Sequence, residues 1–91
     1  MKIATGIKRI ENERLRQIFK KCYDKNHDQQ HSENELLFAA IAYIFEYCIG
    51  EGEGSKYWPW EINSFKPRNN QRDLEKAGAL IAAELDRLKG I

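Results

Sequence analysis

Two imidazoles and two carboxylates fall within one short polar stretch, the densest group of side chains in this chain that could do chemistry. The stretch contains His27, Asp28, His31 and Glu35. All four are metal-binding residue types, and positions 27, 31 and 35 would share one face of a continuous helix. Ser32 and Glu35, however, have the spacing of a capping box, which starts a helix at Ser32 and breaks that face. Three interpretations stay open: a corner between two helices fixed by histidines, a metal site, and a metal-free ligand or catalytic site.

A second group consists of flat aromatic rings held by a proline. Trp58, Pro59 and Trp60 are consecutive, and such rings could stack on a base or a sugar. Indole rings also close hydrophobic cores and form subunit contacts. The sequence leaves these three roles open.

Two cations stand at the start of the last predicted helix, where free amides and the helix dipole favour negative charge. Arg72 and Lys76 could bind an anion there, or they could serve as capping residues and surface ion pairs. If the starts of the helices near 33–49 and 71–89 meet, these residues form a polar mouth beneath the aromatic rings. If the two starts lie at opposite ends, an interaction protein is the better account.

The sequence contains no Ser-His-Asp constellation, P-loop or GxGxxG motif, so it identifies no catalytic residue.

Helices must position these side chains, and the strongest helix signal is the apolar run at residues 36–49. Glu46 is its only charged residue. The run's 14 residues fall short of the roughly 20 that cross a bilayer, so it predicts the central helix of a small bundle, near residues 33–49. Gly50 is placed to end this helix.

Two amphipathic helices are predicted around it, near residues 7–22 and 71–89. The first has its apolar stripe at Ile7, Ile10, Leu15, Ile18, Phe19 and Cys22, with Lys8, Arg9, Arg14, Arg16, Lys20 and Lys21 largely off it. We interpret the charged face as solvated, with a phosphate- or partner-binding surface as the alternative. The last helix has its stripe at Leu74, Ala77, Gly78, Ile81, Leu85 and Leu88. Asn70 and Gly90 are placed to cap it, and Gly78 predicts a close crossing with the central helix.

The connection over residues 50–70 is long and opens with three glycines. Connections of this length without regular structure are usually functional, disordered or packed down on the fold. Tyr57, Trp58, Trp60 and Phe65 argue against disorder, because burying each ring gains roughly 1.5–3 kcal/mol. We expect the loop to pack onto the helices.

Ninety-one residues make one domain, 1–91, and 42% hydrophobic with 32% charged residues favours a folded chain. The net charge of +1 divides into +5 over residues 1–25, −6 over residues 26–63 and +2 over the remainder. The acidic middle argues against nucleic-acid binding.

Cys22 and Cys48 lie in apolar stretches and are interpreted as reduced core residues. The N-terminus has no apolar signal-peptide run, so we expect a cytoplasmic location.

One extended pattern resembles a family of small proteins encoded in phages and prophages, and the likeness covers about residues 14–89. It consists of His31-x3-Glu35-Leu36-x2-Ala39-Ala40-x2-Tyr43, Trp58-Pro59-Trp60, Lys66-Pro67 and Arg72-Asp73-Leu74-x-Lys76-Ala77-Gly78-Ala79-Leu80-Ile81-x-Ala83-Glu84-Leu85-x-Arg87. The resemblance implies a helical fold and a phage context. A weaker resemblance is to MazG-type all-α nucleoside triphosphate pyrophosphohydrolases, whose Glu-x-x-Glu and Glu-x-x-Asp pairs bind Mg²⁺. Here Glu33 and Glu35 are spaced i, i+2 instead.

Together these features predict an all-α three-helix bundle with a long aromatic loop between the second and third helices, completed by dimerisation. The first functional hypothesis is an accessory protein that binds a nucleotide or another phosphorylated small molecule. Its candidate residues are His27, Asp28, His31, Glu35, Trp58, Trp60, Arg72 and Lys76. We predict no resident metal or cofactor, apart from the Mg²⁺ that a MazG-like function would need, and no membrane partner. The alternative is a non-enzymatic interaction module that modifies a host or phage complex.

Overall fold

The computed structural model describes residues 5–20 and 34–90. Within these ranges the chain forms three α-helices and two short 3₁₀ turns, with no strand. The elements are α1 (Gly6–Lys20), α3 (Glu35–Cys48), η1 (Ser55–Tyr57), η2 (Ile62–Ser64) and α4 (Gln71–Lys89). The predicted all-α fold, with a long aromatic loop before the last helix, is therefore confirmed.

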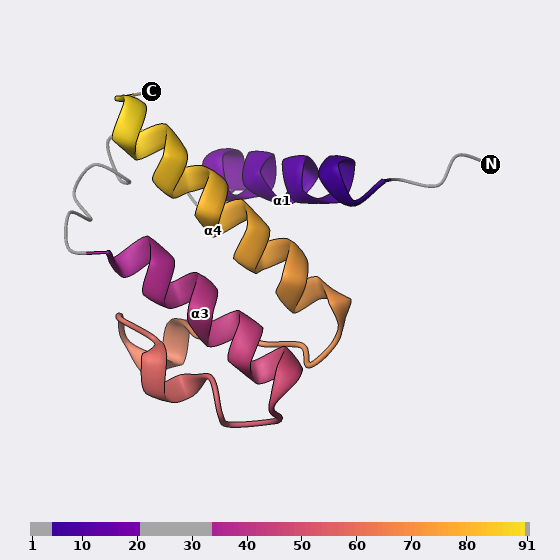
Figure 1. Ribbon diagram of the computed structural model, residues 1–91, viewed down its shortest axis with the longest axis vertical. Helices are drawn as coiled ribbons and strands as arrows, with labels where there is room; N and C mark the ends of the chain where they lie inside the picture. Colours follow the sequence, from indigo (N-terminus) through magenta and orange to yellow (C-terminus); the bar gives the residue numbers. More distant parts are fainter. Residues whose placement is uncertain (1–4, 21–33, 91) are drawn as a thin grey trace.

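Helix α4 is the middle element of the bundle. It packs against α3 on one side and α1 on the other, and Figure 1 shows α3 and α4 lying antiparallel with α1 crossing behind α4. The prediction that the apolar run at 36–49 is the central helix is thus wrong. That run forms α3, which is covered by α4 and by the η1 region of the loop.

Alanines set the close contact between α3 and α4. The core cluster consists of Leu36, Ala39, Ala40, Tyr43, Ala77, Leu80 and Ala83, all at most 5% exposed. Small side chains let two helix axes approach at the short end of the usual range. Ala39 and Ala40 of α3 and Ala77 and Ala83 of α4 are the small side chains of this core.

The helix ends agree with the sequence more closely at α4 than at α3. Asn70 caps α4 by accepting the Arg72 amide proton at 2.8 Å, and Gly90 ends the helix at φ 72°. Helix α3 begins at Glu35 with Asn34 as its N-cap residue, two positions later than predicted, and without a side-chain cap. The Ser32 half of the proposed capping box lies outside the described residues.

At the other end of α3, the residue in the C-cap position is Ile49, and Gly50 follows it at φ 146°. Positive φ is a conformation that glycine adopts without a steric penalty. Gly50 therefore turns the chain directly after the helix instead of occupying the cap itself. Cys48 is exposed and free, which corrects its interpretation as a core residue; Cys22 lies outside the described residues.

Glu46, the only charge in the apolar run, fastens both ends of the 50–70 loop to α3. Its buried carboxylate accepts the Gly52 amide at 2.8 Å, the Gly54 amide at 3.0 Å and the Asn69 side-chain amide at 3.2 Å. Gly54 is itself buried, and a Cβ added there would overlap the Ala42 carbonyl. The loop backbone consequently lies directly on the helix.

Aromatic rings hold the rest of the loop down. Tyr43 of α3 contacts Trp58 edge-on, with 5.5 Å between ring centroids, and Phe65 at 5.0 Å. Trp60 packs edge-on against Trp58 at 5.2 Å. Trp58, Trp60 and Phe65 are partly buried against the core, so the prediction that the loop packs onto the helices is confirmed.

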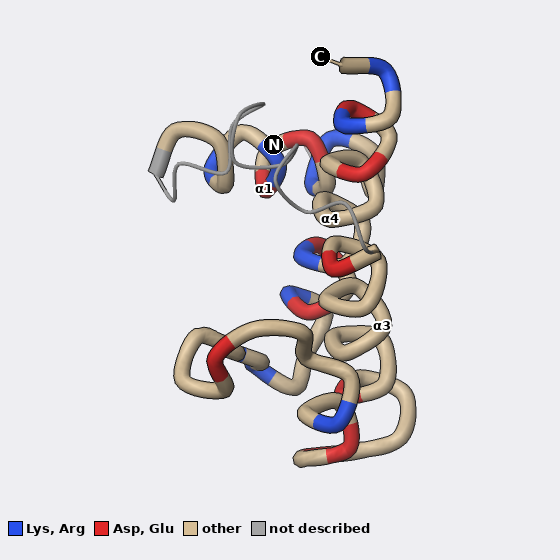
Figure 2. Tube along the Cα trace, turned by 90° about the vertical axis from the view of Figure 1, so that its left-hand side faces the viewer, with Lys and Arg blue, Asp and Glu red and all other residues tan. Residues whose placement is uncertain are grey.

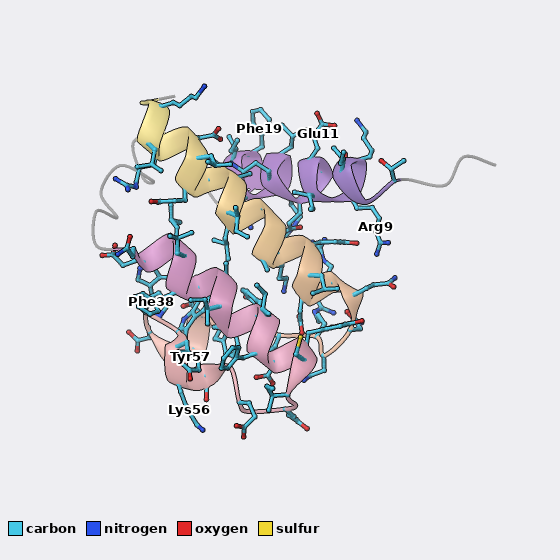
Figure 3. All side chains as sticks on the ribbon, viewed as in Figure 1. Arg9, Glu11, Phe19, Phe38, Lys56 and Tyr57 are labelled. Atoms are coloured by element: carbon cyan, nitrogen blue, oxygen red, sulfur yellow. The ribbon has the colours of Figure 1, made fainter. Side chains whose placement is uncertain are left out.

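Helix α1 is docked with its polar face inward, opposite to the prediction. Glu13 and Gln17 are 2% and 4% exposed, whereas Ile7 and Phe19 are 83% and 77% exposed. Phe19 projects away from α3 (Figure 3). Ion pairs between described residues join this face to α4, among them Arg9 with Glu75 at 2.8 Å, Arg14 with Asp86 at 3.2 Å, and Glu13 with Arg72.

The buried face of α4 is also displaced from its most apolar stripe. Leu74, Ile81, Leu85 and Leu88 are exposed, and the inward face consists of Asp73, Lys76, Ala77, Ala79, Leu80, Ala83 and Glu84. Gly78 marks a close crossing, but with α1 instead of α3, because a Cβ added there would lie 2.6 Å from Ile10 Cδ1.

Candidate functional site

A cleft lies between α1 and the aromatic loop. Both elements project to the same side of the α3–α4 pair, α1 at one end and the loop at the other (Figure 2). The cleft is lined by Glu13, Arg16 and Gln17 of α1, by Trp58, Trp60 and Ser64 of the loop, and by Tyr43, Lys76 and Leu80. The centre of a water-sized molecule has about 20 Å³ available, and the open space including the mouth is about 340 Å³.

Lys76 is fixed beneath the loop. Its ammonium group donates to the Lys66 carbonyl at 2.6 Å and lies 5.2 Å from the centroid of the Tyr43 ring. The Tyr43 hydroxyl in turn accepts the Lys66 amide at 3.4 Å. The cation therefore holds the end of the aromatic loop against α4 and brings positive charge to the cleft floor.

Trp58 is held in the opposite wall. Its indole N–H donates to the Glu61 carbonyl at 3.0 Å and to the Ser64 hydroxyl at 3.1 Å. The Ser64 hydroxyl also donates to the Glu61 carbonyl at 2.7 Å. These contacts fix the ring through the turn η2, so the aromatic wall is pre-formed.

Gln17 is the cleft residue whose hydrogen bonding is incomplete. Its side-chain oxygen is buried, and it has no hydrogen-bond partner among the described residues. An unsatisfied buried acceptor costs roughly 1–3 kcal/mol, and most buried polar groups have a partner. A donor supplied from outside these residues would satisfy it.

Beside the cleft, a network of charges joins α1 to α4. The Glu13 carboxylate accepts two bonds from Arg16, at 3.0 and 3.1 Å, and also pairs with Arg72. Glu75 accepts from Arg72 and from Arg9, each at 2.8 Å, and Arg9 points from α1 toward the start of α4 (Figure 3). The groove over this network has a volume of about 310 Å³ and is lined also by Asn12.

This network shifts the acid–base equilibria of its members. Burial raises the pKa of Glu75, but the hydrogen bonds and charges of Arg72 and Arg9 outweigh it, so the pKa lies below its ordinary value. Burial lowers the pKa of Arg72, and Glu75 and Glu13 more than compensate, so that pKa is raised. The arginines here are engaged by carboxylates, and an incoming anion would have to compete with Glu13 and Glu75.

The predicted ligand residues are partly brought together. Trp58, Trp60 and Lys76 line one cleft, while Arg72 belongs to the neighbouring charge network. Glu35 lies elsewhere, and His27, Asp28 and His31 are outside the described residues.

The starts of α3 and α4 do not meet. Glu35, at the start of α3, is near enough to Glu84, close to the end of α4, for its charge to act on the Glu84 pKa. Glu46, near the end of α3, bonds Asn69, just before α4. The two helices are antiparallel (Figure 1), so the polar mouth that both starts would have formed is absent. The residues described contain no group of three side chains able to hold a metal ion.

Sequence reasoning missed the α1 side of the cleft, formed by Glu13, Arg16 and Gln17. Their charged and polar types suggested a solvated face. One signal was present: Ile10, Glu13, Arg14 and Gln17 are spaced i, i+3, i+4 and i+7, which is the spacing of a buried helix face. Composition alone pointed to the opposite face.

Searches for similar proteins found no match to this chain among family models, curated proteins or solved structures. None of the helices in the described ranges is both long and apolar enough to cross a membrane.

Proposed function

We propose that this chain is a non-enzymatic interaction module whose first partner is a second copy of itself. One observation carries the proposal: apolar side chains of two helices point outward. They are Ile7, Leu15 and Phe19 of α1, and Leu74, Ile81, Leu85 and Leu88 of α4. The four α4 residues share one face of the helix, and an exposed apolar face on a small protein usually marks an interaction site. The antiparallel arrangement of α3 and α4 also favours this function, because it separates residues that a helix-start ligand site would need.

Charge favours a second copy as the occupant of the α4 surface. A two-fold contact brings residues of one stripe opposite the same stripe of the partner, so a charged stripe would repel itself. Ile81, Leu85 and Leu88 are spaced i, i+4 and i+7 and carry no charge. Self-pairing there buries apolar surface from both copies without bringing like charges together.

The resemblance to phage-encoded proteins suggests the wider role. A dimer of this kind would modify a host or phage complex by binding to it, without catalysing a reaction. Binding of a nucleotide or another phosphorylated molecule remains the second proposed function, and it is favoured by the shared position of Trp58, Trp60 and Lys76 on one cleft.

Self-association is tested by multi-angle light scattering of the whole chain at high micromolar concentration. We expect twice the chain mass of 10.7 kDa. Leu85→Glu introduces a charge into the α4 stripe and should return the mass to 10.7 kDa. Ile62→Glu is the matched control, since Ile62 is exposed to a similar extent, 56% against 60%, but lies on η2.

Circular dichroism of each variant checks that the helices are retained. A strict monomer for the native chain, or equal dissociation by both substitutions, would contradict association through α4. A mixed assembly with another protein, in place of a homodimer, would contradict the choice of partner.

A further inference from the structure

We infer that the cleft between α1 and the aromatic loop binds a flat ligand that inserts a neutral N–H donor toward the Gln17 side-chain oxygen. The ligand class is a planar ring bearing an amino or carboxamide group, such as an amino-substituted nucleobase or an aromatic amide. This site is separate from the outward apolar stripe of α4 and does not depend on self-association.

The need for a donor comes from Gln17. Its oxygen is buried and lacks a partner in the described part of the chain, and Gln17 is one of the residues that line the cleft. The available volume of about 20 Å³ is close to the roughly 10–15 Å³ that one water molecule requires by this measure. An amino group has about the size of a water molecule, so one donor group fits and a larger substituent does not.

The cleft charges favour a neutral donor over an ammonium ion. Among the described residues that line it, Arg16 and Lys76 are cations and Glu13 is the one carboxylate, which already accepts from Arg16 and pairs with Arg72. A cationic donor would face two positive charges and one carboxylate that is already paired. A neutral N–H group can bond the Gln17 oxygen without this repulsion.

The flat ring is indicated by the opposite wall. Trp58 and Trp60 lie edge-to-face at 5.2 Å, and Trp58 is fixed by Glu61 and Ser64. Because the deep part holds only the donor group, the ring must remain at the mouth beside the indoles, where stacking contributes roughly 1–3 kcal/mol per base. The mouth is open to solvent, so the part of the ring that does not contact the indoles stays hydrated.

Tryptophan fluorescence provides a direct test, because Trp58 and Trp60 are the two tryptophans of the chain and both line the cleft. The probes are two matched pairs: adenosine against purine riboside, which lacks the amino group, and nicotinamide against methyl nicotinate, which lacks the amide N–H. We expect saturable quenching with at least one amino or amide member and roughly tenfold weaker binding of its partner, as the loss of one hydrogen bond predicts. The pair that responds shows whether the donor is a ring amino group or a carboxamide group.

Gln17→Leu should abolish the discrimination within that pair. Gln71→Leu, at an exposed glutamine on α4, should leave it unchanged. Since Gln17→Leu removes an unsatisfied buried oxygen, its melting temperature should stay the same or rise, and a thermal melt verifies this. Repeating the titration with Leu85→Glu separates ligand binding from self-association.

Three results would overturn the inference. They are no saturable quenching by any probe up to millimolar concentration, equal binding of both members of each pair, and discrimination that survives Gln17→Leu. The last result would leave Gln17 as a water-binding residue.

Discussion

Glu46 shows how one charged side chain can organise an otherwise apolar helix. Burial raises its pKa, but hydrogen bonds from Gly52, Gly54 and Asn69 together outweigh burial, so the pKa lies below its ordinary value. A carboxyl group with a lowered folded-state pKa stabilises the fold above its unfolded-state pKa, about 4.3, and that stabilisation is lost as pH falls through the folded-state value. The acid sensitivity of the loop should therefore reside in Glu46.

We expect Glu46→Gln to lower the free energy of unfolding by about 1–3 kcal/mol at pH 7, because an amide cannot accept all three bonds as a carboxylate does. The difference from the native chain should shrink in acid, as the pH falls through the lowered pKa of Glu46 and the native carboxyl group also becomes protonated. Urea unfolding at pH 7 and at a series of acidic pH values measures this. Glu53→Gln is the control, since Glu53 makes an exposed pair with Lys56 and should change stability by less than about 1 kcal/mol.

Gly54→Ala tests the close approach of the loop to α3. Gly54 has an ordinary φ of −78°, so alanine would be acceptable for the backbone, but its Cβ would overlap the Ala42 carbonyl oxygen. We expect this overpacking to lower the free energy of unfolding by about 1–3 kcal/mol, as measured by thermal unfolding. Gly6→Ala is the control because its Cβ meets open space; an equal loss there would refute the steric explanation.

At the scale of elements, periodicity identifies residues that share a helix face but not which face points inward. The bounds and caps of α4 followed from the sequence because local chemistry determines them, whereas α3 begins two residues later than predicted and without a side-chain cap. The orientation of α1 did not, since its docking depends on Glu75 and Asp86, which lie more than sixty residues further along the chain. The separation of the two helix starts likewise follows from the return path of the long loop.

The docking of α1 should depend on Arg72, which pairs with Glu13 and Glu75. Arg72→Met removes a cation that both carboxylates share, while Arg16 and Arg9 still pair with them. We therefore expect the free energy of unfolding to fall by about 1–3 kcal/mol, which is less than the cost of leaving a buried charge with no partner. The loss should be largest near neutral pH, because the lowered pKa of Glu75 means that its stabilising charge disappears only in acid. Urea unfolding at pH 7 and pH 3 measures both effects.

Arg68→Met serves as the control for that experiment, because the Arg68 residue is exposed and its described contact with Asp73 is made by the backbone amide. We expect a change within about 0.5 kcal/mol. Similar losses for both substitutions would mean that loss of any arginine destabilises the chain and that the α1–α4 network has no special role.

For the whole molecule, the proposed self-association through the outward apolar faces of α1 and α4 would make stability depend on protein concentration. If a second copy covers these faces only in the folded state, the melting temperature must rise with protein concentration. A roughly hundredfold increase adds about 2.7 kcal/mol per dimer, shared by two chains, which corresponds to a rise on the order of 5 °C for domains of this size. Scanning calorimetry across that concentration range measures the shift.

The same experiment separates apolar association from charge pairing. Because Ile81, Leu85 and Leu88 carry no charge, the melting temperature should still rise with protein concentration at 1 M salt. At that salt concentration the electrostatic screening length is about 3 Å, so exposed ion pairs contribute little. Leu85→Glu should melt at one temperature regardless of concentration, and Ile62→Glu should behave as the native chain does. A melting temperature that is independent of concentration in the native chain would show that these apolar faces remain solvated, and the interaction proposal would lose its physical basis.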